Sequence, residues 1–150
     1  MIRKFLVIFL LIVSACGYQP IYLNQNSEKL IFNKISQKGD NDINRKILNY
    51  TSLKEDKLNK SLNELLLFSN FDVQETVKSL ENKSISFRIN VISKISITKN
   101  EKILKSKVFS KSFNFDSKES RYELIEYQNK IKDQLINKIS DDIVLFLITE

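Results

Sequence analysis

The single cysteine of the chain, Cys16, has the most defined chemistry of any residue, because it directly follows a short secretory signal. Arg3 and Lys4 form the positive start of that signal, and residues 5–13 form an unbroken apolar run. The run is too short to cross a bilayer, which takes about 20 apolar residues. A lone thiol in an oxidising compartment forms no internal disulfide, so we expect a modification to consume it.

The residues around Cys16 indicate which modification this is. Segment 13–16, Val-Ser-Ala-Cys, is similar to a bacterial lipobox, in which the cysteine sulfur receives a diacylglycerol before the chain is cleaved on its N-terminal side. We therefore predict cleavage between Ala15 and Cys16 and a membrane anchor on Cys16, since several acyl chains at about 0.8 kcal/mol per buried CH₂ hold where one chain is marginal. Gly17, in place of an aspartate, favours the outer membrane. The alternative is an ordinary signal or anchor with a stray cysteine.

Composition argues against an enzyme. The chain contains no histidine and one cysteine, so zinc sites and histidine-based nucleophile pairs cannot be assembled. The closest carboxylate pairs, Asp40 with Asp42 and Asp141 with Asp142, occur where a solvated loop or helix face explains them. We expect no catalytic residue, no metal and no cofactor.

The net charge carries little information by itself. It falls from +6 to +4 when residues 1–15 are removed, because Arg3 and Lys4 leave with them. Lysine is used heavily along the whole chain, so only the arrangement of the lysines can indicate an anionic partner.

The chain is expected to divide into three parts. Residues 1–15 are a signal peptide, residues 16–29 a lipidated tether, and residues 30–150 one domain.

The first half of the domain contains a strand, a helix and an ambiguous segment. Apolar residues near 30–35 suggest a short strand, and Asp40 or Asn41 is a plausible N-cap for a helix near 42–53. The charged segment 54–61 is expected to be a loop. The pattern over 62–80 fits a helical stripe and a strand face equally well, so periodicity leaves its state open.

The second half is clearer. Apolar and polar residues alternate from Ile85 to Ile97, which predicts a long half-buried strand, and a polar turn at 99–102 leads to a second strand over 103–115. From the capping box that begins at Ser120, apolar residues recur every three or four positions to the end, which predicts one long helix. The expected class is α+β, with an antiparallel sheet of about four strands and two helices packed on one face.

The strand over 103–115 carries the best candidate site. Its lysines share one side with phenylalanines, and cations two residues apart stand about 7 Å from each other, a spacing that suits the phosphates of an anionic glycolipid. The alternative is that they are solvated gatekeepers of an edge strand. An exported lipoprotein rarely meets nucleic acid, so we expect none. The candidate contact residues are Arg88, Lys105, Lys107, Phe109 and Lys111.

Two segments of the sequence carry a resemblance to a known family. They are residues 16–22, Cys-Gly-Tyr-Gln-Pro-Ile-Tyr, and residues 112–116, Ser-Phe-Asn-Phe-Asp, with the long helix that follows them. The first is similar to the start that many members of the lipopolysaccharide-assembly lipoprotein family, LptE, show after the lipobox, and the second is similar to that family's strand end and closing helix. The resemblance implies that 62–80 is a strand.

The resemblance also implies a function. Members of this family sit in the lumen of the large outer-membrane barrel LptD, assist its assembly and help deliver lipopolysaccharide to the cell surface. The expected partners are therefore the barrel, lipopolysaccharide and the membrane through the lipid anchor. Two other classes share the anchor and size: an accessory lipoprotein of a lipid-exporting ABC system, and a purely structural envelope lipoprotein.

Overall fold

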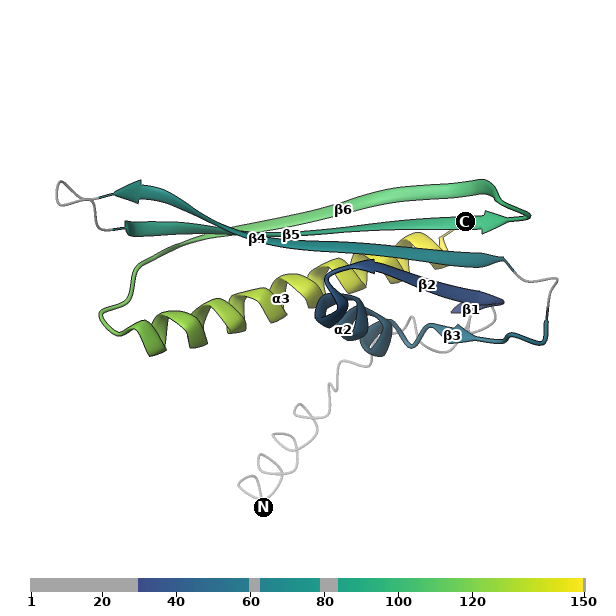
Figure 1. Ribbon diagram of the computed structural model, residues 1–150, viewed down its shortest axis with the longest axis horizontal. Helices are drawn as coiled ribbons and strands as arrows, with labels where there is room; N and C mark the ends of the chain where they lie inside the picture. The colour runs from purple at the N-terminus through teal and green to yellow at the C-terminus, as the bar shows by residue number, and fades with distance from the viewer. Residues whose placement is uncertain (1–29, 60–62, 79–83, 150) are drawn as a thin grey trace, which may run out of the picture.

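A four-stranded sheet with both helices on one face organises the part of the chain that the computed structural model describes, residues 30–59, 63–78 and 84–149 (Figure 1). The predicted signal peptide, lipobox and tether lie outside these residues. The strand order is β2-β4-β5-β6, and two short strands, β1 and β3, pair beside it. The elements are β1 (Ile31–Phe32), β2 (Lys34–Gly39), α2 (Asn41–Thr51), β3 (Lys54–Glu55), β4 (Glu64–Lys78), β5 (Ser84–Lys99), β6 (Lys102–Asp116) and α3 (Arg121–Ile148).

The sheet is mixed, which corrects the expectation of a purely antiparallel one. β2 runs parallel to β4, with Lys34 opposite Glu64 and Gly39 opposite Ser69. Parallel neighbours need a crossover, and α2 provides it by returning the chain to the end at which β2 began. β4 with β5 and β5 with β6 are antiparallel, as expected.

Helix α2 begins where the sequence predicts. The Asp40 carboxylate accepts hydrogen bonds from the backbone N–H groups of Asp42 and Ile43 at 2.9 and 3.1 Å, which confirms the N-cap. The turn before it requires glycine, because Gly39 has φ +80° and an added Cβ would lie 2.0 Å from the carbonyl oxygen of Ser69. The predicted helix over 42–53 is therefore confirmed, with its end two residues earlier.

The ambiguous segment is a strand, as the family resemblance implies. In β4, Leu65 and Leu67 are buried at 1% and 0% exposure, while Leu66 between them is half-buried and Glu64 and Phe68 on either side of them are exposed. This alternation is the signature of a strand with one face on the core. The expected loop over 54–61 contains the short strand β3 in its described part.

The hairpin of β5 and β6 turns at Asn100 and Glu101, which both have positive φ, at 50° and 64°. A two-residue turn of this kind matches the twist of the flanking strands. Ile89, Val91 and Ile95 of β5 are fully buried on the inner face, which confirms the predicted alternation.

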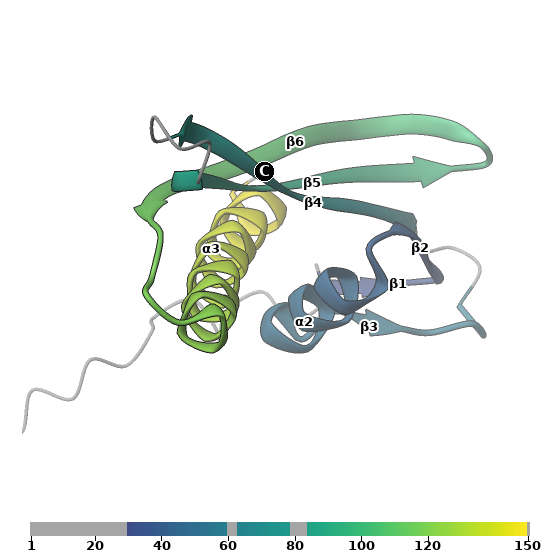
Figure 2. The same cartoon turned by 60° about the vertical axis from the view of Figure 1, so that its left-hand side comes forward.

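Helix α3 closes the core. Its 28 residues span about 42 Å, and the hydroxyl of Ser120 accepts a hydrogen bond from the backbone N–H of Glu123. Figure 2 shows α2 and α3 on the same side of the sheet, as expected. Among the described residues, no helix is both long and apolar enough to cross a membrane. The buried stripe of α3 is Ile131, Leu135, Ile136, Ile139, Ile143 and Leu147.

Candidate functional site

The Lys/Phe side of β6 faces helix α3. Phe109 and Phe115 on this side are 6% and 5% exposed and belong to the core. Phe115 stacks on Phe87 at 5.5 Å and meets the edge of Tyr127 at 5.8 Å. These two phenylalanines share a side with the lysines because this side packs on the helix, whereas Phe113 on the same side is 45% exposed.

Two of the candidate lysines contact the last turns of α3. The Nζ atom of Lys105 donates a hydrogen bond to the carbonyl oxygen of Phe146 at 3.1 Å and lies 3.9 Å from the centre of its ring. The Nζ atom of Lys107 lies 5.2 Å from the centre of the same ring. The rings of Phe109 and Phe146 pack edge to face, with 5.8 Å between their centres. Cations near a helix C-terminus satisfy its last carbonyl groups and interact favourably with its dipole.

The third candidate lysine forms an ion pair with the same helix. The Nζ atom of Lys111 lies 2.8 Å from Oδ2 of Asp142, and each side chain is 38% exposed. All three lysines thus make contacts within the chain. An open depression of about 340 Å³ next to them is lined by Lys107, Phe109, Asp142, Leu145, Phe146 and Thr149. Contact of these lysines with lipid or a barrel wall stays a prediction.

Arg88 does not join the lysines. Its Nε atom donates a hydrogen bond to Oδ1 of Asn114 at 2.8 Å, across the register pair that these two residues form. Arg88 alternates with the buried Ile89 and so lies on the outer face of the sheet, opposite the helices. The candidate residues are therefore divided between two faces.

The outer face carries exposed apolar residues that the sequence reasoning did not single out. Phe68 of β4 and Val108 of β6 both pair with Lys94 of β5, so the three form one row across the sheet. Their apolar members are 41% and 58% exposed, and Ile103 and Leu104 near the hairpin turn are 61% and 53% exposed. In Figure 1 no described element covers this face. The alternation of side chains along β6 could have identified them from the sequence, because it places Leu104 and Val108 on the side opposite the lysines.

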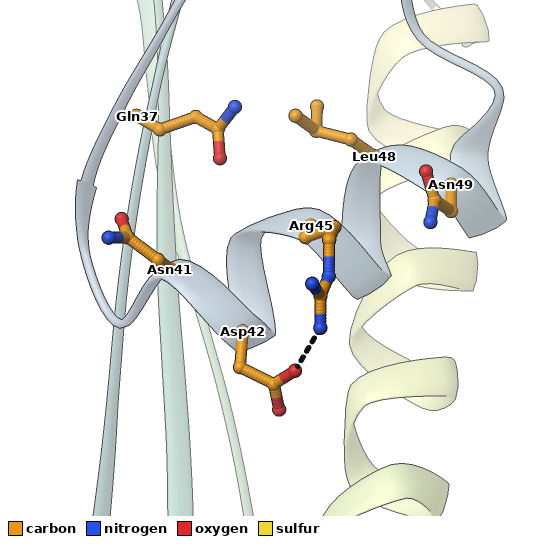
Figure 3. A pocket seen from close by; sticks show the side chains of 6 residues that line it. All are labelled: Gln37, Asn41, Asp42, Arg45, Leu48 and Asn49. Atoms are coloured by element: carbon orange, nitrogen blue, oxygen red, sulfur yellow. Dashed lines mark hydrogen bonds and ion pairs between the residues drawn. The ribbon is translucent and has the colours of Figure 1, made fainter.

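A second depression lies between β2 and α2, with a volume of about 510 Å³ (Figure 3). Its two charged residues pair with each other, since Arg45 donates to Asp42 at 2.9 Å. The depression thus offers hydrogen-bonding amides without a net charge. Its lining is Gln37, Asn41, Asp42, Arg45, Leu48 and Asn49. In the described residues, no group of three or more potential metal ligands comes together.

Asp42 also links the two helices. Its Oδ2 atom lies 3.3 Å from Nζ of Lys46 and 3.4 Å from Nζ of Lys132 on α3, and Lys46 reaches Asp133 at 2.7 Å. Desolvation alone would raise the pKa of Asp42, but the hydrogen bonds and charges of the two lysines together hold it below its ordinary value. The hydrogen bond to Asp133 raises the pKa of Lys46, although desolvation opposes it. This network links α2 to α3 through two ion pairs, Lys132 with Asp42 and Lys46 with Asp133.

Comparison with solved structures defines the fold. Rare lipoprotein B from Shewanella oneidensis superposes with a TM-score of 0.60 at 7% identity, over 77% of this chain and 94% of that one. A lipoprotein B from Nitrosomonas europaea matches with a TM-score of 0.57 at 8% identity, over 85% and 88% of the two chains. A minor lipoprotein from Acinetobacter baumannii matches with a TM-score of 0.52 at 7% identity, over 75% and 88%. The chain has the fold of these lipoproteins.

The sequence itself matches no protein-family model and no curated protein.

Proposed function

We propose that this chain is a lipid-anchored protein of the outer membrane that acts as LptE does. In this role it plugs the lumen of the barrel LptD, assists its assembly and helps deliver lipopolysaccharide to the cell surface. The observation that carries the proposal is the fold shared with rare lipoprotein B, in a chain whose residues 13–16 are similar to a lipobox and whose residues 16–22 and 112–116 resemble LptE.

The surface of the domain supports this role. The lumen of a membrane barrel is polar, so a plug needs a stiff body with polar faces. The middle of the outer face supplies short hydrogen-bonding side chains, with Asn90 of β5 between Asp72 of β4 and Ser112 of β6. A sheet of three long strands backed by a 28-residue helix is a body of this kind.

Lipopolysaccharide is a proposed partner with less support than the barrel. Lys105, Lys107 and Lys111 remain the candidate contacts, although each already touches α3. Phosphates would have to approach them from the open side of the depression between β6 and α3. Arg88 would contact a ligand or barrel only from the outer face.

Depletion of the protein in its native cell tests the proposal. We expect less folded barrel, read from its heat-modifiable migration on gels, and less lipopolysaccharide accessible to surface labelling. Expression of the wild-type chain from a plasmid should restore both. An accessory protein of an ABC system would reduce lipid export while the barrel still folds, and a purely structural lipoprotein would leave both readouts unchanged. Either of these results would contradict the proposal.

A further inference from the structure

We propose that an extended segment of the barrel protein adds as a strand to the open edge of β2 and directs a side chain into the depression between β2 and α2. This segment lies outside the barrel wall. The inference rests on the proposed function, since it names the part of the enclosed domain that the barrel protein binds through its main chain. The depression, here called the edge groove, is lined by Gln37, Asn41, Asp42, Arg45, Leu48 and Asn49.

Strand β2 has one paired edge and one open edge. It is the first strand in the order β2-β4-β5-β6, so within the described residues no strand pairs with the edge that faces away from β4. The short strand β3 lies on this side in Figures 1 and 2, but it pairs only with Ile31 and Phe32 of β1, before β2 begins. An open edge presents N–H and C=O groups that an extended chain binds through main-chain hydrogen bonds.

The open part of this edge is short. Near the end of β2, the carbonyl oxygen of Lys38 already accepts a hydrogen bond from Nδ2 of Asn44 at 2.8 Å. Residues 34–37 therefore remain for an added strand, bounded by β3 at one end and by Asn44 at the other. A short open edge limits pairing with unrelated chains and favours one short segment.

The edge groove lies where a side chain of the added strand would enter. Figure 3 shows Gln37 on β2 and Leu48 on α2 on opposite sides of the groove, with their side chains directed toward each other. Alternate side chains of a strand point to opposite faces of a sheet, so every second side chain of the added segment points toward α2. The groove has a volume of about 510 Å³. Its three amide side chains can each donate to and accept from a peptide group.

The charges of the groove are paired within the chain. The lining contains one positive and one negative residue, Arg45 and Asp42, which lie 2.9 Å apart. The other carboxylate oxygen of Asp42 is 3.3 Å from Nζ of Lys46 and 3.4 Å from Nζ of Lys132. A lining of amides without net charge selects main-chain and polar groups rather than a charged ligand.

The open edge at the other side of the sheet is less suited to this role. Strand β6 carries three lysines on the side that faces α3, namely Lys105, Lys107 and Lys111. Charged side chains on an edge strand oppose pairing with a further strand. On β2 the corresponding side presents Ile35 and Gln37, because these residues lie opposite buried leucines of β4. Lys34 and Lys38 alternate with them and lie on the outer face.

The geometry of a barrel determines which segment can pair with β2. The strands of a closed wall bond to their neighbours along both edges, so the wall itself has no free edge. A segment folded into the lumen keeps its backbone groups available, and loops of this kind plug some barrels. The predicted tether, residues 16–29, is a less suitable occupant, because it must connect the start of the domain to the anchor at Cys16.

Hydrogen–deuterium exchange of the full-length acylated lipoprotein, alone in detergent and in complex with the barrel, tests the inference. In the free protein we expect fast exchange of those amides of residues 34–37 that point to the open edge. In the complex they should exchange at least about tenfold more slowly, because exchange then requires the added strand to open. Residues 104–111 of β6, at the other edge of the sheet, are the internal control and should change less.

Three results of the exchange experiment would overturn the inference. The first is unchanged exchange of β2 in the complex. The second is equal slowing of β2 and β6, which would indicate general shielding by the barrel. The third is slow exchange of these amides already in the free protein, which would mean that another segment of this chain completes β2.

A photo-crosslinker identifies the added segment. p-Benzoylphenylalanine replaces Asn49 in the groove or, as a matched control, Asn137, which is an exposed asparagine on α3. We expect crosslinks from position 49 to map, by mass spectrometry, to one segment of the barrel protein outside its wall strands, and crosslinks from position 137 to map elsewhere. Absence of the crosslink from position 49, or its mapping only to wall strands or to residues 16–29, would contradict the inference.

The isolated complex separates failure of the inference from failure of the proposed function. If no barrel co-purifies with the lipoprotein, the proposed function and the inference fail together. If the complex forms without added protection of β2, only the inference fails.

Discussion

Lys111 and Asp142 join the outermost strand of the sheet to the last turns of the closing helix, with 2.8 Å between Nζ and Oδ2. Lys105 and Lys107 make further contacts with Phe146 on the same helix. The basic side of β6 is thus part of how α3 is held, and any ligand that uses these lysines must compete with those contacts.

Removal or reversal of the Lys111 charge, which pairs with Asp142, should lower the free energy of unfolding modestly. Exposed ion pairs contribute about 0.2–1 kcal/mol, so Lys111→Ala should lower the free energy of unfolding by less than about 1 kcal/mol. Lys111→Glu should cost more, because it puts two carboxylates side by side, and Asp142→Lys in the same chain should restore part of the loss. Urea denaturation of the single and double variants measures this. Strictly additive effects would mean that the two residues do not interact.

Leu135 tests whether α3 packs on the sheet through the core described above. Its side chain is 4% exposed in the middle of the helix. Leu135→Ala should lower the free energy of unfolding by about 2–5 kcal/mol, since it removes buried methyl groups and leaves a cavity. Tyr122→Ala on the same helix, where the side chain is 75% exposed, is the control and should have little effect. Equal melting temperatures for Leu135→Ala and the wild type would refute the packing.

The network around Asp42 predicts the pH dependence of stability. The pKa of Asp42 is lowered in the folded state, so its contribution is complete above about pH 3.9, the unfolded value, and is lost as the pH falls through the folded pKa. The pKa of Lys46 is raised, so its contribution is complete below about pH 10.4 and is lost as the pH rises through the folded value.

Asp42→Asn should therefore flatten the acid side of the stability profile and lower stability near neutral pH. Because the carboxylate is 41% exposed, solvent screening limits this effect to under about 1 kcal/mol. Thermal melts between pH 2 and 11 measure it, with Asp116→Asn as a control on an exposed carboxylate of β6. The same acid limb in Asp42→Asn and the wild type would contradict the assignment.

Cys16→Ser tests the lipid anchor. We expect the variant to lose metabolic labelling by a fatty acid and to leave the membrane fraction, because the serine hydroxyl does not replace the thiol as acceptor of the diacylglycerol. Labelling of intact cells followed by fractionation measures both. Normal labelling of Cys16→Ser would place the acyl chain elsewhere and refute the prediction.

Local patterns predicted the local structure. The alternation of Ile89, Val91 and Ile95 gave β5, and the cap at Ser120 gave the start of α3. In β4, the leucines fit two periodicities equally well, so periodicity could not decide, and the family resemblance implied the strand that the pairing of Leu65 with Ile97 and of Leu67 with Ile95 shows. The paired residues are far apart in the sequence, so the pattern within one segment cannot reveal that they are in contact.

The same limit applies to the site. Parity predicted that Lys105 and Phe109 share one side of β6, but it did not predict that Phe146 lies beneath them. The parallel pairing of β2 with β4 likewise depends on the path of α2 through space. The prediction for Cys16 depends on no such contact, because a processing enzyme would read a linear segment; it stays a prediction.

Recovery of the full-length lipoprotein from detergent-solubilised outer membranes, with mass spectrometry of the bound proteins, tests the central claim most directly. We expect one large outer-membrane barrel to co-purify with the wild-type chain in near-equal amount and to remain bound at high salt, because a protein enclosed in a barrel lumen cannot simply dissociate. An unrelated lipoprotein with the same tag should recover no such barrel. Recovery of an ABC transporter in its place, or of no barrel at all, would contradict the account.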